Sequence, residues 1–277
     1  MRPWAQRGLP GVGSGMMRRI SGLSEIAADF DGMIIDQFGV IHDGAKLYPG
    51  TLEVMARLAE AGIKVVIVTN SGKRSAANVQ RIVKMGVPRE QFIDCISSGE
   101  VAYQSLTVKR AFIIGRRGDN YEFDGIESVD DPRDAEVLLI LGTNVPETSL
   151  EDYRAMLKGV TLPCICCNPD LWMLTPQGLQ PAPGAIAKLY EELGGKVTWI
   201  GKPYPGIYQA ALKLMGNPKR VLCIGDSAEH DVAGGRKAGL ATLLVQQGVS
   251  EGLKEGTISP LPDFLLERFL WAAPLHR

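Results

Sequence analysis

Short, continuous apolar runs alternate along the chain with segments whose apolar residues recur every three or four positions. A continuous run is typical of a strand buried on both faces of a parallel sheet, and the three-to-four spacing is typical of an amphipathic helix. Outside the middle of the chain, this pattern predicts strands at residues 33–35, 64–68, 220–224 and 241–245, and helices at residues 51–61, 75–85 and 231–238.

The middle of the chain repeats this alternation and is punctuated by prolines. There we predict strands at residues 111–114, 137–141 and 162–167, and helices at residues 150–157 and 186–193. Strands that alternate with helices indicate a parallel sheet covered by helices, so the predicted fold class is α/β. We interpret the middle as an inserted α/β domain. The predicted domains are a flexible tail at residues 1–19, a discontinuous core at 20–106 and 199–277, and the inserted domain at 107–198.

Composition limits the class of protein. The chain has 277 residues, of which 45% are hydrophobic, and this suits a globular protein with a sizeable core rather than a disordered one. Lys and Arg total 30 against 31 Asp and Glu, so no general basic field is present to attract nucleic acid. No apolar run approaches the ~20 residues needed to cross a bilayer. We therefore expect neither a nucleic-acid nor a membrane partner, and any anion must bind at a local site.

The cysteines number five, and an odd number does not suggest a disulfide framework. Cys164, Cys166 and Cys167 lie close together, but zinc sites pair such ligands with a second set, and none follows. Because their neighbours are apolar, we interpret them as small buried residues of a strand in a reducing compartment. This interpretation favours a cytoplasmic protein.

Polar residues stand at or within two positions of the ends of three of the predicted strands. Asp36, Asp226 and the pair Thr69 and Asn70 occupy these positions. In an open parallel sheet, ligands bind outside the carboxyl ends of the strands. Carboxylate, hydroxyl and amide groups at that edge suit Mg²⁺, which prefers oxygen ligands and often shares them with a phosphate. Each residue alone could be a cap or turn residue, and it is their joint order that favours a site.

Four segments in this order resemble the motifs of the haloacid dehalogenase (HAD) superfamily, in its NagD-like, type IIA branch. Residues 36–44 with Pro49 and Gly50 resemble motif I, residues 65–71 motif II, residues 201–203 motif III and residues 225–231 motif IV. Residues 168–170 and 183–185 resemble the cap signature of that branch. The resemblance implies a Rossmann-like parallel-sheet core with an inserted α/β cap domain of the C2 type.

The resemblance also implies catalytic and metal-binding roles. Asp36 would be the nucleophile that forms an aspartyl-phosphate, and Lys202 would offset the charge of nucleophile and phosphate. Asp36 and Asp226 would bind Mg²⁺ through their carboxylates, and Phe38 through its backbone carbonyl. Asp231 would orient Lys202 or a water on the metal. Without the resemblance, Lys202 is a turn lysine and Asp231 an acid favoured at a helix N-terminus.

Substrate contacts follow from the same resemblance. Thr69 and the amide of Asn70 would hold phosphate oxygens, with Ser71 beside them. In the cap, Asn168 and Asp170 form a polar and aromatic cluster with the two residues that follow, which suits the grip of a leaving group. The cluster could equally consist of turn and core residues, and the sequence does not decide between these interpretations.

A second segment competes for motif I, because residues 29–32 read Asp-x-Asp-Gly. Asp29 as the nucleophile would require residues 26–28 to form the preceding strand, which is short and weak. It would also put the following Gly and Pro-Gly out of register. Asp36 fits both features, so we predict Asp36 as the nucleophile.

Position 38 departs from the pattern of this branch, in which most phosphatases carry an Asp two residues after the nucleophile. That Asp protonates the leaving oxygen and then activates water, and such a group contributes about 10²–10⁴-fold in rate. Phe38 can do neither. His42 has a suitable pKa and lies nearby in the sequence, but we favour its interpretation as a flap residue that only contacts substrate or solvent.

We therefore predict a Mg²⁺-dependent phosphohydrolase that acts on a small phosphorylated metabolite, of the sugar phosphate or nucleotide class. One alternative is a phosphometabolite-binding or regulatory protein with weak turnover, because Phe38 replaces the acid. Another is a HAD chemistry that needs no acid there, such as phosphotransfer or cleavage of activated phosphates. The identity of the substrate stays open, and a homo-oligomer is allowed.

Overall fold

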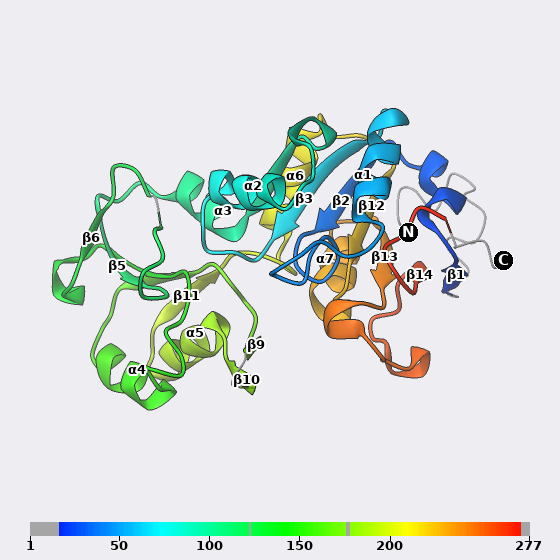
Figure 1. Ribbon diagram of the computed structural model, residues 1–277. Helices are drawn as coiled ribbons and strands as arrows, with labels where there is room; N and C mark the ends of the chain where they lie inside the picture. Colours follow the sequence, from blue (N-terminus) through cyan, green and yellow to red (C-terminus); the bar gives the residue numbers. More distant parts are fainter. Residues whose placement is uncertain (1–16, 122, 176–177, 273–277) are drawn as a thin grey trace. The chain divides into compact units, whose positions relative to one another are not determined.

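The computed structural model of the protein describes residues 17–121, 123–175 and 178–272, and the chain divides into two compact units (Figure 1). The first unit contains the residues up to Thr69, Val79–Ile96, and the chain from Tyr208 onward. The second contains Asn70–Asn78 and Ser97–Ile207. This division groups residues 70–78, which include the first turn of α2 (Ser75–Lys84), with the middle of the chain. The domain boundaries predicted from the sequence, which stay a prediction, begin the inserted domain at residue 107.

A seven-stranded sheet forms the centre of the first unit, with the strand order β1-β14-β13-β12-β2-β3-β4. β2 pairs in parallel with β3 on one side and with β12 on the other, and all five of its residues are buried. The strands are β1 (Arg18–Ile20), β2 (Gly32–Asp36), β3 (Lys64–Thr69), β4 (Asp94–Ser97), β12 (Val221–Gly225), β13 (Ala241–Val245) and β14 (Phe264–Leu266).

The structure describes the predicted N-terminal tail only from residue 17 onward. Of the tail predicted at residues 1–19, residues 1–16 lie outside the described residues. Arg18 and Arg19, by contrast, belong to β1, which pairs in parallel with β14 at the edge of the sheet. Ile20, the last residue of β1, is buried in the core of the first unit. The pairing of β1 with β14 and the burial of Ile20 therefore order Arg18 and Arg19, which the sequence prediction placed in the flexible tail.

α1 (Thr51–Glu60) shows how the local sequence sets a helix. The chain enters through Gly50 at φ +91°, a conformation that glycine adopts without steric cost, and Gly62 at φ +67° follows its end. The buried residues recur at helical spacing and pack into the core: Thr51, Val54, Met55 and Leu58. Beyond α1, the helices are α2 (Ser75–Lys84), α3 (Ser98–Ser105), α4 (Leu150–Leu157), α5 (Pro183–Glu192), α6 (Pro205–Leu214) and α7 (Ala233–Lys237).

The second unit has its own five-stranded sheet, with the order β11-β8-β7-β5-β6 and parallel pairing throughout. Two apolar clusters form its core, one of which includes residues of α4 and α5. A short antiparallel ribbon accompanies the sheet. The strands are β5 (Arg110–Ile114), β6 (Glu127–Val129), β7 (Val137–Ile140), β8 (Pro163–Cys166), β11 (Lys196–Trp199), and in the ribbon β9 (Trp172–Thr175) and β10 (Gly178–Pro181).

The predicted α/β class with parallel sheets is confirmed. The cysteines at 164, 166 and 167 are buried and free, as expected for small buried residues; the first two belong to β8 and Cys167 directly follows it. One predicted helix differs, because residues 231–238 are divided between a π-helical turn (Ala228–Val232) and α7. Over the described ranges, no helix combines the length and the apolar content that crossing a bilayer requires.

Candidate functional site

The sheet of the first unit reverses its chain order between β2 and β12. The chain runs from β2 to β3 and β4 on one side, and later from β12 to β13 and β14 on the other. Ligands of open parallel sheets bind outside the carboxyl ends of the strands at such a point. Asp36 is the last residue of β2, and Asp226 follows the last residue of β12. Asp29 ends a short 3-10 turn that precedes β2, so it lies at the opposite end of that strand.

Three carboxylates form a compact, buried group at this edge. Asp36, Asp226 and Asp231 each offer one oxygen, and these oxygens lie within 4.8 Å of one another. The residues are 6%, 4% and 2% exposed, respectively. Negative charges held this close in a buried site repel one another, and a bound cation would remove that repulsion. A donor set made only of oxygens suits Mg²⁺, so the group can hold this ion.

The carboxylate of Asp226 is fixed by two loops of the first unit. The Val249 N–H donates a hydrogen bond of 2.8 Å to its Oδ2, and the Ser250 hydroxyl donates to its backbone carbonyl. A Cβ at Gly39 or at Gly248 would lie 2.0 Å from the same Oδ2, and both glycines have positive φ. Sequence reasoning missed these contacts, because they form only when the loops after β2 and β13 meet.

Asp231 reaches the group from the π-helical turn. Its Oδ2 accepts the Ser227 N–H at 3.1 Å, so the side chain turns back toward the end of β12. A Cβ at Gly225 would lie 1.9 Å from Asp231 Cγ, and glycine is therefore required there. The turn thus brings a third acidic residue to the strand end, whereas without the resemblance Asp231 was interpreted as an acid at a helix N-terminus.

Phe38 and His42 lie in the flap after β2. The Phe38 side chain is 54% exposed, and its ring meets the His42 ring edge-on with 5.7 Å between centroids. His42 is 1% exposed, its Nδ1 accepts the Gly44 N–H at 2.9 Å, and its Nε2 lies 3.0 Å from the Gln37 amide nitrogen. Burial, assisted by the charge of Arg81, lowers the pKa of His42 to about 4.

His42 therefore does not match its interpretation from the sequence. A residue that contacts substrate or solvent would expose part of its ring, whereas this ring is enclosed. A histidine with a pKa near 4 is neutral at pH 7, so it holds no readily available acidic proton for a leaving group. In this structure His42 supports the flap and the Phe38 ring.

Several predicted substrate residues of the second unit meet at Asn70. The Asn70 Nδ2 donates to Asp170 Oδ1 and to the Lys202 carbonyl, each at 3.2 Å, and its Oδ1 accepts the Lys202 N–H at 2.7 Å. Asn168 accepts the Asp170 N–H at 3.0 Å through its Oδ1. Lys202 itself is 5% exposed. The structure thus joins the motif II, motif III and cap-signature segments through one amide side chain.

The phosphate-binding candidates Thr69 and Ser71 flank Asn70 in the chain. Thr69 ends β3, next to β2 in the sheet, and is 8% exposed. Ser71 Oγ accepts the Lys73 N–H at 3.2 Å, which forms a tight turn after the strand. This chain segment is therefore ordered by hydrogen bonds at the position where the resemblance implies a phosphate grip.

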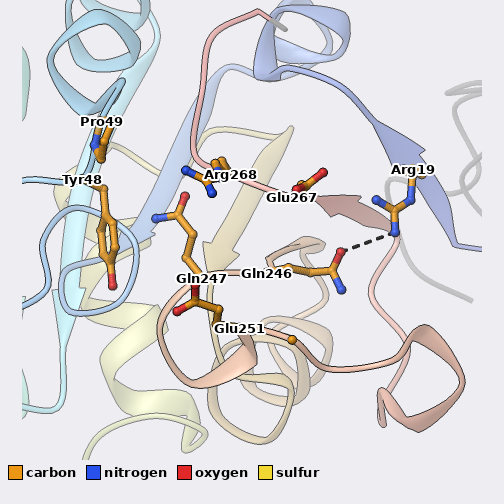
Figure 2. Close-up of a pocket in the computed structure, with 9 residues that line it drawn as sticks. Arg19, Tyr48, Pro49, Gln246, Gln247, Glu251, Glu267 and Arg268 are labelled. Atoms are coloured by element: carbon orange, nitrogen blue, oxygen red, sulfur yellow. Dashed lines mark hydrogen bonds between the residues drawn. The ribbon is translucent and has the colours of Figure 1, made fainter. Parts of the chain in front are cut away.

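A pocket of about 430 Å³ opens beside the loop that fixes Asp226. Figure 2 shows Gln247 extending between Tyr48 and Arg268, at the carboxyl edge beyond β13. Gln247 is 8% exposed, and its Nε2 has no hydrogen-bond partner among the described residues. Burial, with a contribution from the charge of Asp226, raises the pKa of Tyr48, so this phenol stays protonated. Nothing in the sequence marked this pocket.

Two family models match the chain. The model described as haloacid dehalogenase-like hydrolase matches residues 33–129, and a second, described as HAD-hydrolase-like, matches residues 199–272. Together they cover the strand ends that carry Asp36 and Asp226. The residues between the two matches include most of the second unit's sheet.

Known proteins with similar sequences align over most of their length. Chronophin from Rattus norvegicus is 26% identical over 251 residues, which cover 84% of this chain and 81% of the relative. The ribonucleotide monophosphatase NagD from Escherichia coli (strain K12) is 27% identical over 240 residues, covering 82% and 89%. The crystal structure of a haloacid dehalogenase-like hydrolase from Brucella suis 1330 is 27% identical and has a TM-score of 0.79, covering 91% of this chain and 100% of that one.

Proposed function

Because the chain belongs to the haloacid dehalogenase-like hydrolases, we propose that it is a Mg²⁺-dependent phosphatase that acts on a small phosphorylated metabolite of the sugar phosphate or nucleotide class. The observation that carries this proposal is the buried group of carboxylates where β2 and β12 meet. The relative NagD is named as a ribonucleotide monophosphatase, which supports the nucleotide side of the substrate class.

The donor set of the first unit fits Mg²⁺. Asp36 and Asp226 would hold the ion through carboxylate oxygens, the Phe38 backbone carbonyl would add a third ligand, and Asp231 would orient a water on it. When bound, Mg²⁺ neutralises negative charge on the carboxylates and on a substrate phosphate. Since residue 38 would contribute only its backbone, its apolar side chain does not interfere with metal binding.

Asp36 is the proposed nucleophile. One of its carboxylate oxygens attacks phosphorus in line with the ester oxygen, so that a new P–O bond forms while the ester P–O bond breaks and the departing alcohol takes up a proton. Water then attacks the phosphorus of the aspartyl-phosphate, which releases inorganic phosphate and restores the carboxylate. β2 supports this role, because a fully buried central strand holds its last side chain in one position.

The proposed phosphate grip consists of Thr69, the backbone amide of Asn70 and Ser71, with Lys202 offsetting negative charge. Asn70 supports this assignment, since its side chain bonds both the N–H and the carbonyl of Lys202 and so fixes the backbone of motif III. Asn168 and Asp170 belong to the same hydrogen-bonded cluster. We propose that they orient the grip and contact the leaving group.

Phe38 limits the kind of ester that is cleaved well. Neither Phe38 nor the buried His42 supplies a proton near pH 7. The leaving alcohol must then obtain its proton from water or depart as an anion, which favours esters with stable leaving groups. The missing acid at position 38 predicts weak turnover of esters with poor leaving groups. The similarity to NagD, named as a monophosphatase, gives no support to a protein that only binds its ligand.

The proposal is tested by turnover of p-nitrophenyl phosphate and a panel of sugar phosphates and nucleoside monophosphates, with and without Mg²⁺. We expect Mg²⁺-dependent release of inorganic phosphate from wild type and from Asp29→Asn, and at least ~10⁴-fold less from Asp36→Asn, as for loss of a nucleophile. Thermal stabilisation by ligands without any turnover would instead support the binding protein. Loss of turnover in Asp29→Asn alone would overturn the assignment of the nucleophile.

A further inference from the structure

The second unit has a pocket of its own at the carboxyl edge of its sheet. The chain passes from β5 to β6 on one side and then crosses to β7 on the other, so the reversal point of this sheet lies between β5 and β7. A pocket of about 710 Å³ opens there, past the ends of these strands. We call it the β5–β7 pocket and define it by its charged and buried polar lining residues Lys73, Arg116, Arg117, Asp119, Thr143 and Glu147.

Cationic side chains outnumber carboxylates around this pocket. Lys73 Nζ lies 2.9 Å from Asp119 Oδ1, so these two charges offset each other. In the part of the chain that the structure describes, neither Arg116 nor Arg117 forms an ion pair, and Glu147 is the carboxylate that remains in the lining. Two arginines that line the same pocket, and that have no ion-pair partner among the described residues, favour an anionic ligand, which guanidinium groups can bind through several N–H groups.

Thr143 adds a buried donor to the same pocket. The residue is 6% exposed, and its Oγ1 has no hydrogen-bond partner among the described residues. A buried hydroxyl without a partner loses the hydrogen bonds it makes to water, and this costs stability. Such groups are uncommon in folded proteins unless a ligand completes them. An anionic oxygen in the pocket would accept a hydrogen bond from this hydroxyl.

The wall that carries the arginines is fixed by Tyr121. Its Oη accepts the Arg116 N–H at 3.0 Å. A Cβ at Gly115 would lie 2.3 Å from the Tyr121 ring, and a Cβ at Gly142 would lie 2.4 Å from Oη, so both strand ends need glycine to admit this side chain. Burial raises the pKa of Tyr121 to about 12, and its phenol stays neutral. The backbone of Arg116 is thus held in place before a ligand arrives.

Chain connectivity relates the pocket to the proposed phosphatase site. Ser71 lines the pocket and follows Thr69, the last residue of β3, by two positions. Two residues of chain span at most about 7 Å, whatever the arrangement of the two units. A ligand that contacts Ser71 therefore stays close to the strand end where the phosphate grip is proposed.

We propose that the β5–β7 pocket binds a second anionic group of the substrate, a phosphate or a carboxylate, through Arg116, Arg117 and Thr143. The preferred substrate is then a phosphate monoester that carries another acidic group several atoms away from the ester. This inference rests on the proposed function, because it assigns a substrate class to the same phosphatase.

Matched pairs of esters test the proposal. 3-Phosphoglycerate and glycerol 3-phosphate differ only in a carboxylate against a hydroxymethyl group, and glucose 1,6-bisphosphate and glucose 6-phosphate differ in a second phosphate. We expect kcat/KM to favour the more acidic member of at least one pair by about 10- to 100-fold, the range for hydrogen bonds between charged groups. A preference within the first pair shows that the β5–β7 pocket binds a carboxylate, and a preference within the second pair shows that it binds a phosphate.

The double variant Arg116→Gln with Arg117→Gln should reduce this preference to within about twofold, mainly through KM, and Thr143→Val should reduce it less. Arg110→Gln is the matched control, because Arg110 is an exposed arginine at the amino end of β5, the strand that leads to Arg116. This control removes one positive charge at a position outside the pocket, so the preference for the more acidic ester should persist.

The two proposals fail in different ways. If wild type hydrolyses p-nitrophenyl phosphate but shows no preference within either pair, or if the double variant keeps the preference, the second anionic subsite is wrong and the phosphatase stands. If no ester is hydrolysed, the phosphatase is wrong. Calorimetric titration of Asp36→Asn with the same four compounds then still decides the subsite, since binding needs no turnover. Equal affinities within both pairs overturn it.

Discussion

Replacing Phe38 by aspartate places a carboxyl group at the position where the resemblance to the HAD motif I implies an acid. The Phe38 side chain is 54% exposed, so the substituted residue has room, and the metal ligand expected there is the backbone carbonyl. A carboxyl group at this position can donate a proton to the leaving oxygen when it is protonated, and can accept one from water when it is ionised. The substitution therefore tests whether the missing acid limits the reaction.

The expected magnitudes separate catalysis from stability. A positioned acid contributes about 10²–10⁴-fold, or about 3–5 kcal/mol of barrier. The lost packing is smaller, because about half of the Phe38 surface is buried, roughly 100 Å², which corresponds to about 2 kcal/mol of unfolding free energy. For a chain of this size, that loss lowers the melting temperature by about 5 °C, so the variant should stay folded at 25 °C.

The assay compares glucose 6-phosphate, which has a poor leaving group, with p-nitrophenyl phosphate, which has a good one. We expect Phe38→Asp to raise kcat for glucose 6-phosphate by 10²-fold or more and to change p-nitrophenyl phosphate turnover by less than about tenfold. Phe38→Asn is the matched control, since it removes the same ring and has the same size without an acidic proton. If Phe38→Asp is folded, binds Mg²⁺ and is no faster than Phe38→Asn on glucose 6-phosphate, the missing-acid argument is refuted.

Two further predictions concern the first unit. Gly248→Ala should lower the apparent Mg²⁺ affinity by at least ~10-fold, because its Cβ would displace Asp226 Oδ2. Gly252 also has positive φ, but a Cβ there would meet nothing within 4 Å, so Gly252→Ala should cost only the ~1–2 kcal/mol of backbone strain. Titration of turnover with Mg²⁺ measures the first effect, and thermal melts measure the second. The pKa of His42 falls from 6.5 to about 4 on folding, so the stability it contributes is complete above pH 6.5 and is lost as the pH falls toward 4. Urea unfolding at pH 7 and pH 4.5 should show that His42→Gln loses about 2–3 kcal/mol less than wild type over this interval, and equal losses would contradict the assignment.

The central strands could be predicted because burial on both faces leaves a continuous apolar run. β2, β3, β12 and β13 all carry such runs, and all were predicted within one or two residues. β11, in contrast, alternates exposed and half-buried residues at a sheet edge, and β14 is only three residues long, so neither gives a pattern that stands out from a loop. β11 pairs with β8, and β14 pairs with β1 and β13, so both strands gain their order from partners elsewhere in the sequence.

The same distinction applies to the candidate site. Asp36 and Asp226 were identifiable because each stands at the end of an apolar run, Asp226 after one glycine, and strand order then brings them together. The contacts that fix Asp226, from Val249 and Gly248, have no local signal because they depend on two loops meeting. His42 shows the complementary difficulty. Its ordinary pKa suggested chemistry, and only its burial shows that the ring is neutral and structural.

The enclosure of Asp226 affects the number of oxygens that this carboxylate can give to an ion. Its Oδ2 already accepts the Val249 N–H and is enclosed by the backbones of Gly39 and Gly248. Such a carboxylate is suited to monodentate coordination through its other oxygen. Small ions with octahedral shells at about 2.0–2.1 Å accept monodentate carboxylates, whereas Ca²⁺, with six to eight ligands at about 2.3–2.6 Å, often takes them as bidentate. Discrimination between these two ions would then depend on a pair of glycines as well as on the acidic residues themselves.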